Sequence, residues 1–424
     1  MTAAPLPPSL YAETARPAPA TPPLDGDRRA SVCVIGGGFT GLSTALHLAE
    51  QGVDVVLVER NTPGWGASGR NGGQVNPGLK WDPDRVEADF GPDLGTRMVA
   101  MAWDAPNVVF NLVARHQITC EASQSGTLRA AFQANNVTEI AAAYEQGARR
   151  GMPVEQLDRA ALRTATGTER YLTALLDRRG GHVNPLGYAR GLAQAAQQAG
   201  AAIHGGTPAE RIYRDGADWK VVTPSGTITA ERLVLGTNGY TDDLWPQLRR
   251  SVVPVFSGIA ATEPLPDAVA RDILPLRSAV YELGSITTYY RLDRDNRLLM
   301  GGRCRQREIA APGEVQWMID YAQRLWPQIK PFKWTHGWSG QLAVTPDHYP
   351  HVHEPAPGVL VCVAYNGRGV AMASTMGAQL ARRTLGGDID MPVTGLKEIP
   401  FHALWKTAVS ARVLYGRIRD YLHV

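Results

Sequence analysis

A cluster of glycines followed by an acidic residue is the part of this sequence whose spacing most directly implies chemistry. Gly36, Gly38 and Gly41 form a G-x-G-x-x-G pattern between two apolar, strand-like runs, 32–35 and 53–58. In a strand–turn–helix unit, the first glycine permits a tight turn, the second admits a pyrophosphate, and the third lets helix and strand pack closely. The helix start offers N–H groups to the phosphates. Glu59 lies where an acid usually accepts ribose hydrogen bonds, so we predict a dinucleotide site rather than an ordinary glycine-rich turn.

A second glycine-rich stretch, residues 61–74 (NTPGWGASGRNGGQ), follows directly. Its glycines let the backbone lie against a ligand. We expect it to start beside the ribose and pyrophosphate and to lead toward whatever lies beyond them. Arg70 would then meet a phosphate or a flavin carbonyl, and the alternative is a mobile loop with a solvated arginine.

A second junction of strand, glycines and helix lies near the C-terminal end. The apolar run 359–364 leads into Gly367, Arg368 and Gly369, and a helix is expected over 370–383. If that helix is aimed at a flavin, its positive end would stabilise the negative charge of the reduced ring. The alternative is an ordinary helix start whose glycines serve packing. Another strand-like run, 232–240, stops at a Gly/Asn turn that we expect to abut the cofactor.

Composition, charge and cysteine spacing exclude several classes of protein. The chain has 424 residues, 44% hydrophobic content and a net charge of +3. No basic run suggests nucleic acid, and no apolar run is long enough to span a membrane. The Pro/Ala-rich N-terminus lacks the features of a secretory signal, so we expect a cytoplasmic protein with an extended arm. The four cysteines lack metal spacing, and we expect them to be free, with Cys33 and Cys362 buried.

The remaining elements follow from periodicity and turn residues. We expect a helix over 96–117, bent or broken by Pro106, and a single strand over 201–212. Other expected elements are a strand at 126–132, helices at 135–150, 185–200, 314–325 and 405–422, a hairpin over 219–230, and paired strands 287–292 and 297–303. The last of these helices is basic, and we expect it to dock on the body of the protein.

Taken together, these motifs resemble one enzyme family. WGASGRNGGQ after Glu59, then GGHVNP, YYRL…NRLLMGGR and YNGRGV, are similar to stretches of the gamma-glutamylputrescine oxidase family, within the D-amino-acid-oxidase-like flavoenzymes, over roughly residues 30–420. The resemblance implies an α/β (α+β) fold with a Rossmann-like FAD-binding domain of three discontinuous segments and a substrate domain with an antiparallel sheet. The implied division is an arm (1–27), the FAD-binding domain (28–79, 152–250 and 332–390), the substrate domain (80–151 and 251–331) and a helical tail (391–424).

Motifs and resemblance together give a set of candidate residues around the cofactor. The cofactor-binding candidates are Gly36, Gly38, Phe39, Thr40, Gly41, Glu59, Arg60, Gly66, Ala67, Ser68, Arg70, Asn71, Gly72, Gly73, Gln74, Ala209, Thr237, Asn238, Gly239, Gly340, Gly367, Arg368, Gly369 and Val370. Tyr289, Tyr290 and Arg303 are the substrate-facing candidates. Arg303 would hold a carboxylate with two hydrogen bonds, whereas either tyrosine is equally well explained by strand packing.

Two departures from related sarcosine oxidases matter. Residues 340–343 offer no cysteine for a covalent flavin link, so we predict non-covalent FAD. Residues 297–300 lack the lysine found there in those enzymes, which leaves the oxygen-activating group unassigned and dehydrogenase behaviour open. His336, His348, His351 and His353 fit no zinc pattern, and we expect no metal site.

The expected reaction is oxidation of a C–N bond in an amine such as gamma-glutamylputrescine. A neutral amine would pass hydride to flavin N5, the imine would hydrolyse to an aldehyde plus amine, and O2 would accept the electrons as H2O2. No catalytic side chain is assigned, because the flavin carries the chemistry. Alternatives are a secondary amino-acid oxidase or dehydrogenase for a pipecolate-, sarcosine- or hydroxyproline-like substrate, a flavoprotein without turnover, and an NAD-dependent dehydrogenase, which is disfavoured by the single fingerprint. The oligomeric state stays open.

Overall fold

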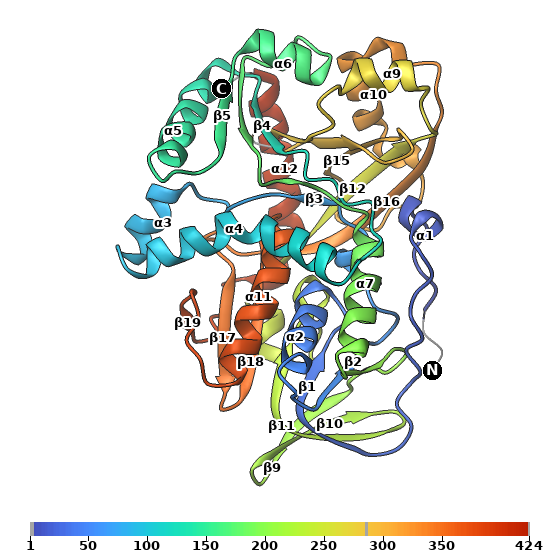
Figure 1. Ribbon diagram of the computed structural model, residues 1–424, viewed down its shortest axis with the longest axis vertical. Helices are drawn as coiled ribbons and strands as arrows, with labels where there is room; N and C mark the ends of the chain where they lie inside the picture. Colours follow the sequence, from blue (N-terminus) through green and yellow to red (C-terminus); the bar gives the residue numbers. More distant parts are fainter. Residues whose placement is uncertain (1–3, 285–286, 423–424) are drawn as a thin grey trace.

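Two large sheets organise the chain, one in the lower and one in the upper part of Figure 1, with helices packed around them. The computed structural model describes residues 4–284 and 287–422. The architecture is the mixed α/β fold that was predicted.

The nine-stranded sheet draws on three separated parts of the chain, as expected for the FAD-binding domain. Its order is β19-β17-β18-β11-β1-β2-β8, and the β9–β10 hairpin extends from β11. Neighbours in the central run from β18 to β8 are parallel. The strands are β1 (Arg28–Ile35), β2 (Val55–Val58), β8 (Ala202–His204), β9 (Arg211–Asp215), β10 (Asp218–Thr223), β11 (Gly226–Leu235), β17 (His351–Ala356), β18 (Val359–Val363) and β19 (Val393–Thr394).

Strand β1 explains why its sequence reads as a continuous apolar run. Val32 and Val34 belong to the core shared with the helices on one face, whereas Cys33 and Ile35 belong to the core on the other face. A parallel strand buried on both faces needs apolar residues at every position. The helices of the first core are α2 (Phe39–Ala49), α4 (Leu94–Arg115), α7 (Pro185–Gln198) and α11 (Gly369–Thr384).

The eight-stranded sheet has the order β16-β12-β15-β14-β13-β4-β6-β5 and is antiparallel except between β13 and β4. Helices α6 (Arg159–Thr166), α9 (Asp267–Ile273) and α10 (Gln316–Leu325) cover one face (Figure 1). The strands are β4 (Thr127–Ala131), β5 (Val154–Leu157), β6 (Thr173–Asp177), β12 (Val253–Thr262), β13 (Ala279–Leu283), β14 (Tyr289–Leu292), β15 (Leu298–Arg303) and β16 (Trp334–Val344). The other elements are β3 (Gln74–Val75), β7 (Gly181–His182), α1 (Leu10–Thr14), α3 (Pro83–Phe90), α5 (Val137–Ala148), α6 (Arg159–Thr166), α8 (Pro246–Arg249), α9 (Asp267–Ile273), α10 (Gln316–Leu325) and α12 (Trp405–Leu422).

The expected domain boundaries differ from the strand pairing at two places. Strands β5 and β6, assigned by sequence to the FAD-binding part that was to resume at residue 152, pair with β4 in the eight-stranded sheet. Strand β16, expected after residue 332 in the FAD-binding part, pairs with β12 in the same sheet. Apolar alternation predicts where strands lie but not which strands pair, so the sequence did not show where the chain passes from one sheet to the other.

One element prediction is wrong, and of the two effects predicted for Pro106, a bend or a break, the break does not occur. The run 201–212 holds two strands, β8 and β9, with a loop between them. Helix α4 continues through Pro106, which has no N–H for the carbonyl of Ala102. That carbonyl instead accepts a hydrogen bond from the N–H of Gly78 at 2.9 Å, and this tertiary contact removes the expected break.

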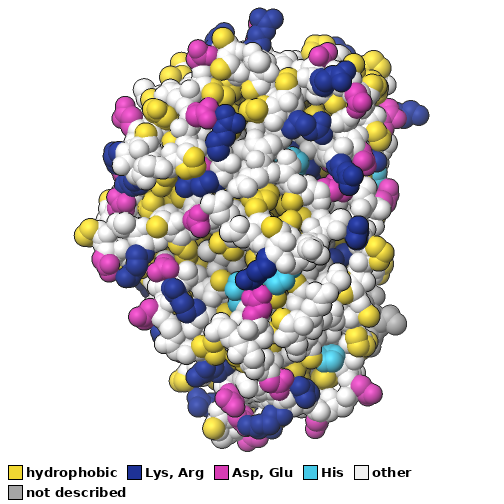
Figure 2. Space-filling model, in the orientation of Figure 1, with side chains coloured by type: hydrophobic (Ala, Val, Ile, Leu, Met, Phe, Trp, Pro, Cys, Tyr) yellow, Lys and Arg dark blue, Asp and Glu magenta, His cyan; other side chains and the backbone are white. Residues whose placement is uncertain are grey.

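The two ends of the chain lie against the body. The arm contains α1, whose Leu10 and Tyr11 are buried, and its later residues run beside α7 and β8 (Figure 1). Helix α12 places Trp405 and Val409 at the wall of the large cleft described below. On the face drawn in Figure 2, positive and negative side chains are interspersed rather than separated into patches. Within the described part of the chain, no helix has the length and apolar character needed to cross a bilayer.

Candidate active site and cofactor cleft

A cleft of about 1210 Å³ collects residues from both sheets and from all three segments of the nine-stranded sheet. Every predicted cofactor residue lines it except Gly41 and Gly73. Of the predicted substrate residues, Tyr289 and Arg303 line it and Tyr290 does not. The structure thus brings the distant motifs together in one cavity.

The first glycine turn has the geometry that a dinucleotide site requires. Gly36 has φ +106°, a left-handed backbone conformation that favours glycine. A Cβ on Gly41 would lie 2.0 Å from the carbonyl oxygen of Gly36, so this glycine serves the close packing of α2 on β1 and not ligand contact. Gly38 is the N-cap of α2 and supplies no side-chain cap. The helix therefore points its N–H groups into the cleft, apart from Phe39, whose N–H donates to Ser68 Oγ at 3.0 Å.

Glu59 closes this end of the cleft. Its carboxylate accepts hydrogen bonds from the N–H of Gly37 at 2.7 Å and of Asn61 at 2.8 Å. Burial raises the pKa of Glu59, and the two backbone donors lower it in part. These contacts hold the carboxylate beside the glycine turn, at the position expected for contact with a ribose.

The loop 61–74, here called the cofactor loop, is fixed by many internal and tertiary contacts. Arg70 is buried, with its guanidinium 4.6 Å from the Trp65 ring centroid and 5.2 Å from that of Tyr240. It also donates to Tyr240 Oη and forms an ion pair with Glu308 at 3.2 Å. Because its cation already has these partners, Arg70 shapes the wall of the cleft.

The N-terminus of a second helix, α11, also faces the cleft, and it comes from the last of the three chain segments that form the nine-stranded sheet. Arg368 is the N-cap of α11, and its Nη2 donates to Tyr281 Oη at 3.0 Å, with the guanidinium 4.8 Å from the ring centroid. Its Nη1 is buried and has no hydrogen-bond partner among the described residues. A buried donor without a partner is costly, which indicates that a bound group accepts from it.

Tyr289 and Tyr290 lie on opposite faces of β14, as neighbours in a strand must. Tyr289 faces the cleft, its Oη 3.1 Å from Ser257 Oγ, and burial raises its pKa to about 12. Its ring lies so close to Gly301 and Gly72 that a Cβ on them would come within 2.2 and 2.5 Å of it. Tyr290 is fully buried behind the sheet, where its Oη lies 2.6 Å from Tyr171 Oη. The prediction that Tyr290 faces the substrate is therefore wrong.

Lys80 is a cleft residue that the sequence analysis missed. It lines the cavity with Arg303 and Arg368, and its ammonium has no hydrogen bond or ion pair among the described residues. The side chain is exposed at the wall of the cleft, yet desolvation by the surrounding residues, then the charges of Arg368, Arg129 and Arg303, lower its pKa to about 8. The sequence held one signal that could have pointed to Lys80 as a cleft residue. It is a lysine just after the cofactor loop, in a chain whose basic residues are mostly arginine.

Two smaller differences concern single residues. His348, expected at the surface or in a supporting position, lines the cleft, where burial and Lys80 lower its pKa. Ala209 lines the cleft as expected, but it lies in the loop between β8 and β9 rather than in a strand. Among the residues that the structure describes, no cluster of His, Cys, Asp and Glu has the arrangement of a metal site.

Comparison with known proteins identifies the family. The family model described as FAD dependent oxidoreductase (DAO) matches residues 31–383. The chain belongs to this family. It is 33% identical over 405 residues to a probable oxidoreductase OrdL of Rhizobium meliloti (strain 1021), covering 92% of this chain and 91% of that protein. It is 32% identical over 387 residues to gamma-glutamylputrescine oxidoreductase of Escherichia coli (strain K12), covering 90% and 89%.

Solved structures confirm the fold. The crystal structure of glycine oxidase from Geobacillus kaustophilus superposes with a TM-score of 0.73 at 22% identity, covering 86% of this chain and 97% of that one. This flavoenzyme family uses FAD, and the cleft suits it: two helix N-termini, a glycine turn, and a buried unpartnered guanidinium nitrogen line one elongated cavity. The chain is therefore an FAD-dependent oxidoreductase.

Proposed function

We propose that this enzyme oxidises the C–N bond of a small amine that also carries a carboxylate, with gamma-glutamylputrescine as the leading substrate. The observation that carries the proposal is the charge of the cleft end away from the glycine turn. Lys80, Arg303 and Arg368 line that end, whereas the acidic residues among the described lining are Glu59 and Asp242. Glu59 lies at the glycine turn, and Asp242 is paired with Arg60.

This arrangement favours a substrate with a carboxylate. A carboxylate beside Lys80 and Arg303 gains charge-assisted hydrogen bonds, which are stronger than neutral ones. The same positive charges disfavour an ammonium group, so they promote loss of the proton from the substrate nitrogen. A neutral amine is the form whose lone pair can assist hydride loss.

The residues of this chain bind and orient the substrate. FAD, when bound, accepts the hydride from the carbon beside the nitrogen. Tyr289, held against Gly72 and Gly301, forms one wall of the substrate site. The resulting substrate imine takes up water to give an aldehyde or ketone and ammonia, or a free amine where the substrate nitrogen is secondary. The electrons then pass to O2, giving H2O2, or to another acceptor.

The name of the Escherichia coli relative supports the choice of gamma-glutamylputrescine. Non-covalent attachment of FAD is part of the proposal, because none of the four cysteines is among the described lining residues and all four are buried and free. Acid precipitation should therefore release the yellow flavin into the supernatant.

The test is anaerobic mixing of the purified holoenzyme with a panel of amines while flavin absorbance is followed. We expect gamma-glutamylputrescine to bleach the flavin faster than putrescine, which lacks the carboxylate. Faster bleaching by pipecolate, sarcosine or hydroxyproline would favour a secondary amino-acid oxidase or dehydrogenase instead. Peroxide release on admission of air then separates oxidase from dehydrogenase.

A further inference from the structure

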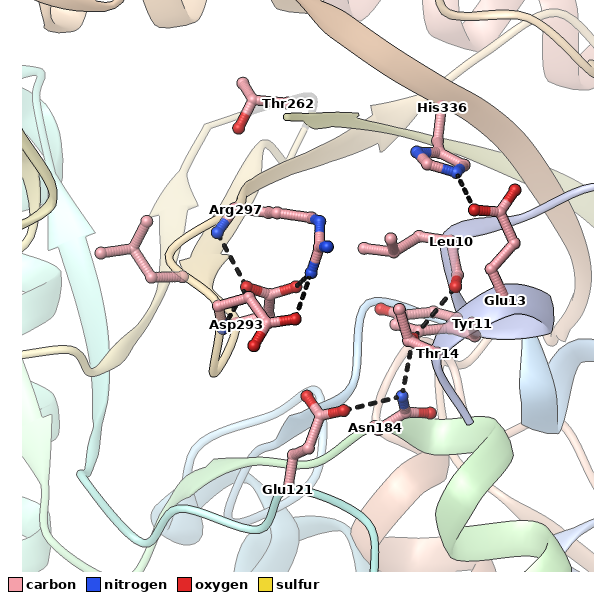
Figure 3. Close-up of polar contacts among 12 residues, drawn as sticks. Leu10, Tyr11, Glu13, Thr14, Glu121, Asn184, Thr262, Asp293, Arg297 and His336 are labelled. Carbon is pink, nitrogen blue, oxygen red and sulfur yellow. Dashed lines mark hydrogen bonds and ion pairs between the residues drawn. The ribbon is translucent and has the colours of Figure 1, made fainter. Parts of the chain in front are cut away.

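The N-terminal arm is packed into the structure at its short helix. Leu10 and Tyr11 of α1 are each 1% exposed and share a hydrophobic cluster with Trp338 of β16 and Leu186 of α7. Figure 3 shows the polar contacts around them: Glu13 pairs with His336 at 3.1 Å. Asn184 Nδ2, at the start of α7, donates to Thr14 Oγ1 at 3.2 Å (Figure 3). The helix therefore bridges the eight-stranded sheet and the FAD-binding part.

The arm also contacts the first half of the cofactor loop directly. The N–H of Ala4 donates to Asn61 Oδ1 at 3.0 Å. Trp65 Nε1 donates to the carbonyl oxygen of Pro5 at 2.9 Å. The Trp65 ring in turn stacks with the guanidinium of Arg70, and both residues belong to the cofactor loop and line the cleft.

Tyr11 reaches the second half of the loop through two buried side chains. Arg291 Nη2 donates to Tyr11 Oη at 3.2 Å, and Arg291 Nε donates to the carbonyl oxygen of Gly72 at 2.7 Å. The Tyr11 ring packs edge-on against Trp338, with 5.2 Å between centroids. Trp338 Nε1 donates to the carbonyl oxygen of Arg70 at 3.0 Å. The arm thus supports the loop from Asn61 to Gly72.

We propose that residues 4–15, which we call the N-terminal strap, are a positioning element that holds the cofactor loop in its FAD-gripping conformation. The proposal rests on the proposed FAD-dependent function and on the prediction from the sequence that the cofactor loop lies along the cofactor. The matched family model begins at residue 31, so the strap lies outside the part that defines the family.

The physical reason is the composition of the loop. Five glycines in 61–74 give the free loop many backbone conformations, and ordering them on binding costs free energy. Contacts that order the loop in advance reduce that cost and tighten binding. Because Tyr289 packs against Gly72, the strap also affects the wall of the substrate site.

The test compares FAD binding by apoprotein variants. We expect the double variant Leu10→Ala/Tyr11→Ala to raise the Kd for FAD at least about tenfold, with faster flavin dissociation and faster hydrogen exchange in 61–74. Deletion of residues 2–8 leaves α1 in place but removes the contacts to Asn61 and Trp65, and it should act in the same direction. Arg16→Gln, at an exposed side chain just after the strap, is the matched control, and its Kd should stay within about twofold of wild type.

Far-UV circular dichroism verifies that each variant is folded. A folded double variant or deletion variant with wild-type FAD affinity and wild-type exchange in 61–74 would overturn the proposal. The deletion keeps the test decisive if the double variant does not fold. These measurements need no amine, so a wrong substrate assignment would leave their result intact.

Discussion

Lys80 offers the sharpest test of the electrostatic account, because its charge is present in the cleft without a protein partner. Replacing it in Lys80→Met keeps much of the aliphatic side chain and removes the ammonium. A carboxylate ligand should then bind more weakly, while an amine without a carboxylate should lose nothing from this change. Lys80→Arg, which keeps the charge, should retain most of the affinity.

The size of the effect follows from the interaction lost. Hydrogen bonds to charged groups contribute about 1.5–3 kcal/mol, which corresponds to a factor of about 10–150 in Kd. A bare charge pair at 4 Å with an effective dielectric constant of 20 would give about 4 kcal/mol, an upper bound before desolvation is subtracted. Because Lys80 is exposed, solvent screens its charge, and exposed ion pairs contribute only about 0.2–1 kcal/mol. We therefore expect Kd to rise about two- to fivefold in Lys80→Met.

The assay follows the flavin spectrum as glutarate, a carboxylate ligand without an amine, is titrated into the holoenzyme between pH 6.5 and 9.5. The pKa of Lys80 is lowered to about 8, so its ammonium is charged below pH 8 and neutral above it. Wild-type affinity should be high below pH 8 and fall as the pH rises through about 8. The Met variant should lack this step.

Lys330→Met serves as the control, because Lys330 is exposed and does not line the cleft. Equal glutarate affinity in wild type and Lys80→Met, or the same pH step in both, would refute the assignment of the anion site to Lys80.

Three further predictions concern the cofactor turn and the two tyrosines. Gly38→Val places a branched side chain at the N-terminus of α2 and should abolish FAD retention; a yellow, fully loaded variant would contradict the site. Gly301→Ala would bring a Cβ within 2.2 Å of the Tyr289 ring, so we expect slower flavin reduction by substrate with FAD content unchanged, and unaltered reduction would show that the ring position is unimportant. Tyr290→Phe removes a buried hydroxyl next to Tyr171 and should lower the free energy of unfolding by about 1–3 kcal/mol without changing reduction kinetics, whereas a kinetic effect would restore it to the site.

Local patterns predicted the glycine turns and helix starts that the structure brings together at the cleft; that these residues bind the cofactor stays a prediction. The glycine turn, the cofactor loop and the junction at Gly367 each combine a strand, a conformational requirement and a helix start within a few residues. Such signals need no knowledge of distant partners. These local signals predict the elements β1, α2 and β2. The family resemblance adds the prediction that the three motifs meet in one cleft.

The parts that were missed depend on distant residues. The pKa of Lys80 is lowered first by desolvation and then by the charges of Arg368, Arg129 and Arg303, and all of these depend on residues far away in sequence. Tyr290 differs from Tyr289 only in the face of β14 it occupies, and alternation alone does not tell which face is the cleft. Pro106 stays in a helix because Gly78 supplies the missing donor.

The arm illustrates the same limit. Its prolines predict extended backbone, and most of it is extended, but nothing local shows that Leu10 and Tyr11 enter a core built from β12, β15, β16 and α7. Burial of this pair depends on surfaces that exist only after the rest of the chain has folded.

The central claim is that one cleft holds FAD and presents its ring to a carboxylate-bearing amine. The most direct measurement is a crystal structure of the holoenzyme with glutarate. We predict that the adenosine half of FAD lies at Gly36 and Glu59, the flavin ring lies between Arg368 and Tyr289, and the glutarate carboxylate contacts Lys80 or Arg303. A flavin ring outside this cleft, or glutarate bound away from both cations, would contradict the account.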